Sequence, residues 1–398
     1  MLLENLLRLK DTKLRYPIIQ GGMGAGVSLY RLASAVGKKG GMGTISSVGL
    51  EQFTRARLLK QGEKVKDETP KKINYIEATE REIYDTKKEA GLAAINIMCA
   101  LPLFYEKAVE GAVRGGVDMI ISGAGLPIEL RGDNSVDLPF LVRKYAGKDH
   151  NINLVPIVSS ALIFNKLCKS WARQGYRPDA VVLEGPKAGG HIGWSYKRVE
   201  RSENFLEEYD LFDKLLDPVL GVADKYKNDF GPIPVFVAGG IFTHKDILYA
   251  LDRGAAGVQM GSRFAVTDES GFSDESKDII INAKKEDIVI ADQVWGSPCK
   301  FPFRYVKTSP LAKEKKGNYF CICSTLLAAA GIDNTKLCGT KGFPKRCPEK
   351  YALLDKKALC PATNTVSYKS LVTCGSEAYR IKRELSVKEL MDELIGLR

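Results

Sequence analysis

Short runs of apolar, often β-branched residues recur along the chain, and each is followed by a turn and a segment with helical spacing. The runs are continuous rather than alternating, as expected for parallel strands covered on both faces. Eight strand–helix units in sequence predict a closed (β/α)8 barrel, the TIM barrel, rather than an open doubly wound sheet. The predicted strands are residues 17–20, 43–46, 93–98, 118–122, 153–158, 180–183, 234–238 and 257–260.

Segments between these runs carry apolar residues at helical spacing. We predict helices at residues 28–39, 104–114 and 161–174. Thr243 is suited to cap a helix over residues 244–253 that Gly254 ends.

A chain of 398 residues exceeds a simple barrel of about 250. We expect the barrel to occupy residues 1–296, with a charged, helical insertion at about 50–90 and another at about 195–232. The strand–helix rhythm then stops, so residues 297–398 are expected to form a small Cys-rich C-terminal subdomain packed on the barrel. Residues 386–397 predict a helix within it.

The net charge of +11 does not by itself indicate a nucleic-acid partner, because no basic run alternates with aromatic residues that could stack on bases. The N-terminal residues 1–10 predict a short amphipathic helix rather than a leader peptide. No apolar stretch reaches the ~18 residues that span a bilayer. These features favour a cytoplasmic protein without a membrane or nucleic-acid partner.

Nine cysteines, an odd number, favour free thiols in such a chain. Six of them fall between Cys321 and Cys374, with Cys299 just before. Their spacing contains no C-x2-C pair and fits neither zinc nor ferredoxin sites, so we predict no metal.

Two glycine turns follow consecutive strands at one end of the predicted barrel. Gly239 and Gly240 end the seventh strand, and Gly261 and Ser262 end the eighth. A phosphate often binds between these loops in TIM barrels, since glycines expose backbone N–H groups and a helix N-terminus adds favourable dipole charge. We therefore predict a phosphate site here, with the Ser262 hydroxyl as a further donor.

The first strand ends in a glycine run, Gln20-Gly21-Gly22-Met23, that would let a planar ring lie close to the backbone. Asn96 ends the third strand on the same face, where its amide could pair with a ring nitrogen or carbonyl.

His191 is the histidine placed for chemistry. It lies in the loop Gly189-Gly190-His191-Ile192-Gly193 after the sixth strand, where an imidazole could exchange a proton with a bound substrate. By contrast, His150 is predicted in a surface loop and His244 in a structural role.

Five segments together resemble the nitronate monooxygenase family, formerly 2-nitropropane dioxygenases, which includes flavin-dependent enoyl-acyl-carrier-protein reductases. They occur in the family's order within about residues 14–300, at 19–24, 96–98, 189–193, 238–241 and 257–264. The resemblance implies an FMN barrel and makes His191 a base or positioning group. The FMN contacts that it implies are Gln20, Gly21, Gly22, Met23, Asn96, Gly190, Gly239, Gly240, Gln259, Gly261 and Ser262.

The sequence leaves three functions open, of which we expect the first. The first is oxidation of an alkyl nitronate with O2, and the second is an NAD(P)H-dependent flavin reductase, with NADH or NADPH reducing the flavin for an enoyl thioester on an acidic carrier protein. The third is a non-catalytic flavin- or phosphate-binding barrel. A nucleotide-monophosphate dehydrogenase is disfavoured, because the loop after the sixth strand lacks a cysteine. The oligomeric state stays open, a homodimer included.

Overall fold

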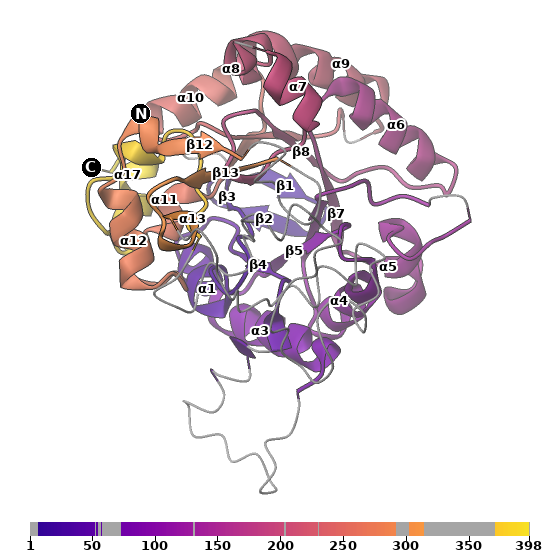
Figure 1. Ribbon diagram of the computed structural model, residues 1–398. Coiled ribbons are helices and arrows are strands. Elements are labelled where there is room, and N and C mark those ends of the chain that lie inside the picture. Colours follow the sequence, from indigo (N-terminus) through magenta and orange to yellow (C-terminus); the bar gives the residue numbers. More distant parts are fainter. Residues whose placement is uncertain are drawn as a thin grey trace, which may run out of the picture.

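The computed structural model describes residues 7–51, 53–54, 57, 73–129, 132–202, 204–229, 231–291, 302–313 and 371–397. Eight parallel strands form one sheet that follows the chain around a ring (Figure 1). They are β3 (Ile18–Gln20), β4 (Thr44–Ser46), β5 (Ala94–Met98), β6 (Met119–Gly123), β7 (Asn153–Val158), β8 (Val181–Glu184), β10 (Val235–Ala238) and β11 (Gly257–Met260).

The ring closes where β3 meets the residues just before β4. Ile19 pairs with Met42, whose N–H donates to Ile18 C=O at 2.9 Å and whose C=O accepts from Gln20 N–H at 2.9 Å. The fold is therefore a closed (β/α)8 barrel, as predicted from the eight apolar runs. The interior is filled by small and aliphatic side chains together with the Phe236 ring.

A ring of helices covers the outer face of the sheet (Figure 1). The α10 helix begins as predicted, since Thr243 and Asp246 form a capping box. The α1 helix shows the pattern of the others, burying Leu32, Ala33 and Val36 against the strands. The helices are α1 (Tyr30–Lys38), α3 (Tyr75–Ala90), α4 (Pro102–Arg114), α5 (Leu138–Ala146), α6 (Ala161–Ala172), α9 (Asp217–Lys225) and α10 (His244–Asp252).

Two long connections interrupt this rhythm. The segment after β4 leads to α3, where the buried Glu82 carboxylate accepts from Tyr30 N–H at 2.8 Å and from Arg57 Nε at 3.0 Å. The segment after β8 contains α7 (Tyr196–Arg201), α8 (Phe205–Glu208) and the π-helix η1 (Leu211–Leu216).

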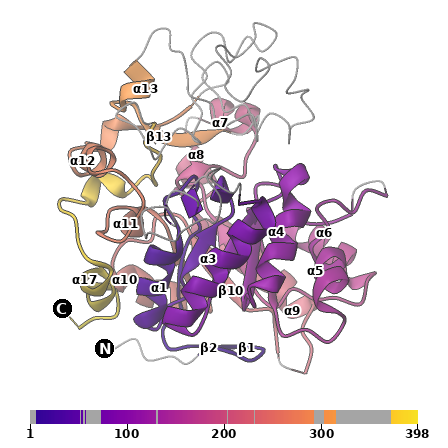
Figure 2. The same ribbon diagram turned by 90° about the horizontal axis from the view of Figure 1, so that it is seen from below.

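The prediction of a helix over residues 1–10 is wrong for residues 7–10, the part of it that the structure describes. Strands β1 (Leu7–Leu9) and β2 (Thr12–Leu14) form an antiparallel hairpin below the barrel (Figure 2). Leu9 and Leu14 point into the barrel interior while Arg8 and Lys13 are exposed, which is a period of two rather than of 3.6. Burial of both leucines against the barrel floor outweighs helical spacing.

A small antiparallel sheet lies at the opposite end of the barrel. It joins β9 (Gly190–His191), β12 (Ile288–Ile290) and β13 (Phe303–Val306), so residues from beyond the barrel pair with the histidine loop. The remaining elements are α11 (Ser262–Ala265), α12 (Asp274–Ile281), η2 (Lys285–Asp287), α13 (Pro310–Lys313), η4 (Ala378–Arg380) and α17 (Val387–Leu394).

The α17 helix anchors the C-terminal segment to the outside of the barrel. Ser386 caps it, and it buries Leu390, Met391 and Leu394 against α1, α10 and α11. His244 Nδ1 lies 2.8 Å from the Leu394 carbonyl oxygen, which confirms a structural role for this histidine. In the described residues no helix is both long and apolar enough to cross a bilayer.

Candidate active site

A cavity of about 480 Å³ opens at the carboxyl ends of the barrel strands. Parallel strands direct their last residues and following loops to this face, so segments distant in sequence meet there. His191 lines the cavity together with ten of the residues predicted to contact a cofactor: Gly21, Gly22, Met23, Asn96, Gly190, Gly239, Gly240, Gln259, Gly261 and Ser262.

Gln20 is the predicted site residue that the structure places elsewhere. It is fully buried and does not line the cavity. Its amide nitrogen donates to Ser28 Oγ at 2.9 Å, and its amide oxygen accepts from Thr44 N–H at 3.0 Å. Gln20 therefore shapes the glycine run from behind, by fixing the backbone that follows it.

The turn after β10 has no room for side chains. Gly239 and Gly240 have φ values of +97° and +90°, a region that L side chains rarely adopt. A Cβ at Gly239 would lie 2.9 Å from the Ala188 nitrogen, and one at Gly240 would lie 2.9 Å from Lys187 Cδ. The glycines thus let this turn pack directly against the loop after β8, at the N-terminal side of α10.

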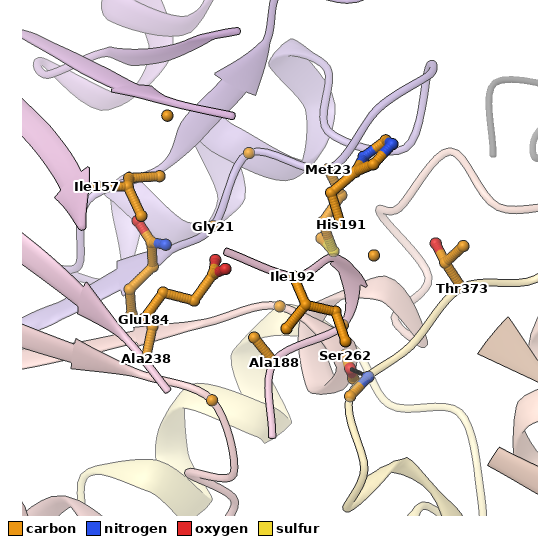
Figure 3. Close-up of a pocket in the computed structure, with 18 of the residues that line it drawn as sticks. Gly21, Met23, Ile157, Glu184, Ala188, His191, Ile192, Ala238, Ser262 and Thr373 are labelled. Atoms are coloured by element: carbon orange, nitrogen blue, oxygen red, sulfur yellow. Dashed lines mark hydrogen bonds between the residues drawn. The ribbon is translucent and has the colours of Figure 1, made fainter. Parts of the chain in front are cut away.

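The C-terminal segment forms a wall of the cavity that sequence reasoning missed. Thr373, Cys374, Gly375 and Glu377 line it, and Figure 3 shows Thr373 on the same side as Ser262. A Cβ at Gly189 would lie 2.5 Å from both the Cys374 carbonyl carbon and the Gly375 nitrogen. No motif marks this long-range contact, because it depends on two backbones approaching each other.

His191 lies on β9, which fixes its backbone by pairing with Phe303 in β13. The rings of His191 and Phe303 are 6.2 Å apart between centroids. Burial lowers the pKa of His191 to about 4, so the imidazole is neutral at pH 7. Figure 3 shows the imidazole and the Glu184 carboxyl group on different sides of the cavity.

Glu184 is a second titratable group of the cavity, and sequence reasoning did not select it. It is the last residue of β8 and lies in register with Ala238 of β10. Burial raises its pKa to about 7, and the Arg304 guanidinium acts in the opposite direction. The sequence signal that could have identified Glu184 is its position, because it is a carboxylate at the end of an apolar strand and therefore on the catalytic face of the barrel.

Arg304 holds the histidine loop from outside the barrel. It is buried in β13 opposite Gly190, and its guanidinium donates to the Ala188 carbonyl oxygen. Burial lowers its pKa to about 10, which still leaves it protonated at pH 7. Arg304 therefore fixes the loop that carries His191 at Ala188, through its side chain, and at Gly190, through strand pairing.

The donor and acceptor groups of the cavity suit a flavin. Gln259 Oε1 is buried without a hydrogen-bond partner among the described residues, and a ligand N–H would satisfy it. Gly22 lies so close to Asn96 that a Cβ there would be 2.4 Å from Asn96 Cβ. A flat ring system can lie on such a surface, with its phosphate at the glycine turns.

No cluster of metal-ligating side chains occurs within the described part of the chain. Cys99, Cys168 and Cys374 are buried free thiols. The other six cysteines lie outside the described residues: Cys299, Cys321, Cys323, Cys338, Cys347 and Cys360.

This closed barrel, with its cavity at the carboxyl face, belongs to a flavin-dependent oxidoreductase. Residues 7–396 match the family described as nitronate monooxygenase, and the chain belongs to that family. A probable nitronate monooxygenase of Staphylococcus saprophyticus is 26% identical over 300 residues, covering 72% of this chain and 75% of the relative. One from Staphylococcus aureus strain Newman is 27% identical over 297 residues, covering 71% and 74%.

Two solved structures share the fold. FabK from Thermotoga maritima has a TM-score of 0.57 at 20% identity, covering 96% of this chain and 92% of that one. A nitroalkane oxidase from Streptomyces ansochromogenes has a TM-score of 0.57 at 18% identity, covering 96% and 94%. At these identities the likeness shows the barrel architecture alone.

Proposed function

We propose that the cavity binds FMN and that the enzyme oxidises alkyl nitronates with O2. One observation carries the proposal: a single cavity contains both glycine turns and His191. The turns are suited to bind a phosphate, and the neutral imidazole can donate a hydrogen bond to a small anion. The family relationship supports the same activity.

Residues already described would hold the cofactor. The turns at Gly239–Gly240 and Gly261–Ser262 would bind the phosphate, while Gly21–Met23, Asn96, Gly190 and Gln259 would surround the ring. When bound, the flavin supplies the electron transfer between nitronate and O2 that no side chain performs.

The neutral His191 imidazole would donate an N–H hydrogen bond to a nitronate oxygen and so orient the substrate. A bound anion favours the protonated form of a nearby histidine, which strengthens this interaction on binding. Glu184 is largely protonated below pH 7 and then does not repel the anion. The Arg304 cation beneath the histidine loop contributes favourable charge.

A second candidate is an NAD(P)H-dependent reductase of an activated alkene, such as an enoyl thioester. The apolar side chains of Leu126, Ile157, Val158 and Ile163 line the cavity and would suit an acyl chain. Both candidates require the same flavin and differ in the molecule that reduces it.

Anaerobic reduction of the flavin distinguishes the two candidates. Purified protein loaded with FMN is mixed with an alkyl nitronate, with NADH or with NADPH, and the flavin absorbance is followed. Rapid bleaching by the nitronate alone is the expected result. Rapid bleaching by a nicotinamide alone would replace it with the reductase, and protein that takes up no FMN would contradict both.

A further inference from the structure

Lys187 lies where three elements of the proposed phosphate site meet. A Cβ at Gly240 would lie 2.9 Å from Lys187 Cδ and 3.2 Å from Lys187 Cβ, so the lysine stem packs on the turn after β10. The Lys187 carbonyl oxygen accepts from Ser376 N–H at 3.0 Å. A Cβ at Gly375 would lie 3.1 Å from the same oxygen, and Gly375 N–H donates to Ser262 Oγ at 2.7 Å.

The charge of Lys187 is not balanced within the described part of the chain. Two other charged residues of the cavity wall have partners, since Arg263 pairs with Glu393 at 2.6 Å and Glu377 pairs with Arg380 at 3.5 Å. No carboxylate of the described residues forms an ion pair with the Lys187 ammonium. A cation is thus held against the glycine turn with its charge available to a ligand.

We propose that the Lys187 ammonium is the counter-ion of the FMN phosphate, an inference that rests on the proposed function. A phosphate monoester carries about −1.5 to −2 charges at pH 7. The glycine turns offer backbone dipoles, which supply partial charges and no full positive charge. An ammonium on a flexible stem supplies that charge, as lysines in other phosphate-binding loops do.

Comparison of FMN with riboflavin isolates this interaction, because riboflavin has the same ring and ribityl chain but no phosphate. Dissociation constants of both flavins are measured by quenching of flavin fluorescence, on flavin-free protein, at low and high KCl. The variants are Lys187→Met, which keeps an unbranched apolar stem, Lys187→Gln as a second neutral form, and Lys187→Arg, which keeps the charge. Lys169→Gln, an exposed site on α6, removes the same charge elsewhere.

Both neutral variants should bind FMN about 10- to 100-fold more weakly, the range expected for loss of a charged hydrogen bond. The riboflavin affinity of the neutral variants should stay within about twofold of that of the unaltered protein. Both flavin affinities of Lys169→Gln should also stay within about twofold, as should the ratio of FMN to riboflavin affinity of Lys187→Arg. The salt dependence of FMN binding should also weaken in the neutral variants.

An equal loss of affinity for both flavins would show a packing role and overturn the inference, as would unchanged FMN affinity. In either case the unaltered protein still binds FMN, so the proposed function stands. Unaltered protein that binds neither flavin would overturn the proposed function and this inference with it.

Discussion

The backbone N–H of Gly375 donates a hydrogen bond of 2.7 Å to the hydroxyl oxygen of Ser262, 113 residues earlier in the chain. Because this hydroxyl accepts from the C-terminal segment, its own proton remains available to a ligand. One side chain therefore joins the barrel, the C-terminal segment and the proposed phosphate site.

Ser262→Ala should affect both stability and cofactor binding. Without the hydroxyl, Gly375 N–H loses its acceptor, and we expect a loss of about 1 kcal/mol in the free energy of unfolding of the flavin-free protein. Urea titration measures this loss, and fluorescence titration measures the accompanying weaker FMN binding. Weaker FMN binding with unchanged stability would argue that the Gly375 hydrogen bond contributes nothing.

Gly189→Ala should disrupt the contact between the histidine loop and the C-terminal segment. Its Cβ would lie 2.5 Å from two backbone atoms, which cannot rotate away, so we expect destabilisation of about 2 kcal/mol or more. Gly221→Ala in α9 is the matched control, because nothing lies within 4 Å of its Cβ. That change should stabilise by up to about 1 kcal/mol through helix propensity. Similar melting temperatures for the two variants would contradict the contact.

His191→Ala should retain flavin and lose turnover. Removal of a positioning imidazole is expected to lower kcat/KM for a nitronate about 100-fold or more. Oxygen consumption measures turnover, and the ratio of flavin to protein absorbance measures cofactor content. His244→Asn serves as the control, since it removes the contact with Leu394 on the outside of the barrel and should leave kcat of the folded protein unchanged. Normal turnover of His191→Ala would exclude a role in the reaction.

Glu184→Gln should change the pH dependence of stability. The pKa of Glu184 rises from 4.5 to about 7 on folding, so its stabilising contribution is complete below pH 4.5 and is lost as pH rises through 7. We expect this loss to be about 2–3 kcal/mol in the flavin-free protein. Relative to the unaltered protein, the variant should therefore gain stability between pH 5 and pH 8.

His191 has the opposite dependence, because its pKa falls from 6.5 to about 4 on folding. Its contribution is complete above pH 6.5 and is lost as pH falls toward 4, so the two groups oppose each other between pH 4.5 and 6.5. Melting temperatures of both proteins at pH 5, 6.5 and 8 test the Glu184 effect. A difference that stays constant across this range would show that Glu184 is ionised throughout.

The barrel could be predicted from sequence because continuous apolar runs report burial on both faces, a property of each strand taken alone. The eight observed strands match the predicted runs to within one residue at each end. The hairpin at Leu7–Leu14 was missed, since four leucines in residues 2–7 imitate helical spacing. The sequence signal for a hairpin was the alternation of apolar and charged residues, such as Lys13 and Leu14, and the placement of Leu9 and Leu14 on either side of the Lys10–Asp11 turn.

The cavity was predicted in part for a related reason. Glycine turns and His191 follow strands directly, so the strand order alone brings them to one face. Glu184 directly follows the predicted strand at residues 180–183 but was not selected, because its raised pKa depends on burial that the sequence does not state. Arg304 and Gly375 reach the site through contacts with Ala188 and Ser262, which no local pattern encodes.

The β1–β2 hairpin has a kinetic consequence. Leu9 and Leu14 fill the amino end of the barrel and close it. The Asn153 amide holds the hairpin in place by donating to Thr12 Oγ1 at 2.8 Å. Reactants would then reach the flavin ring only from the carboxyl side of the barrel. The organic substrate and oxygen would have to use the same entrance. Because a monooxygenase transfers an oxygen atom to its organic substrate, the proposed activity would require oxygen to reach the flavin past the bound substrate.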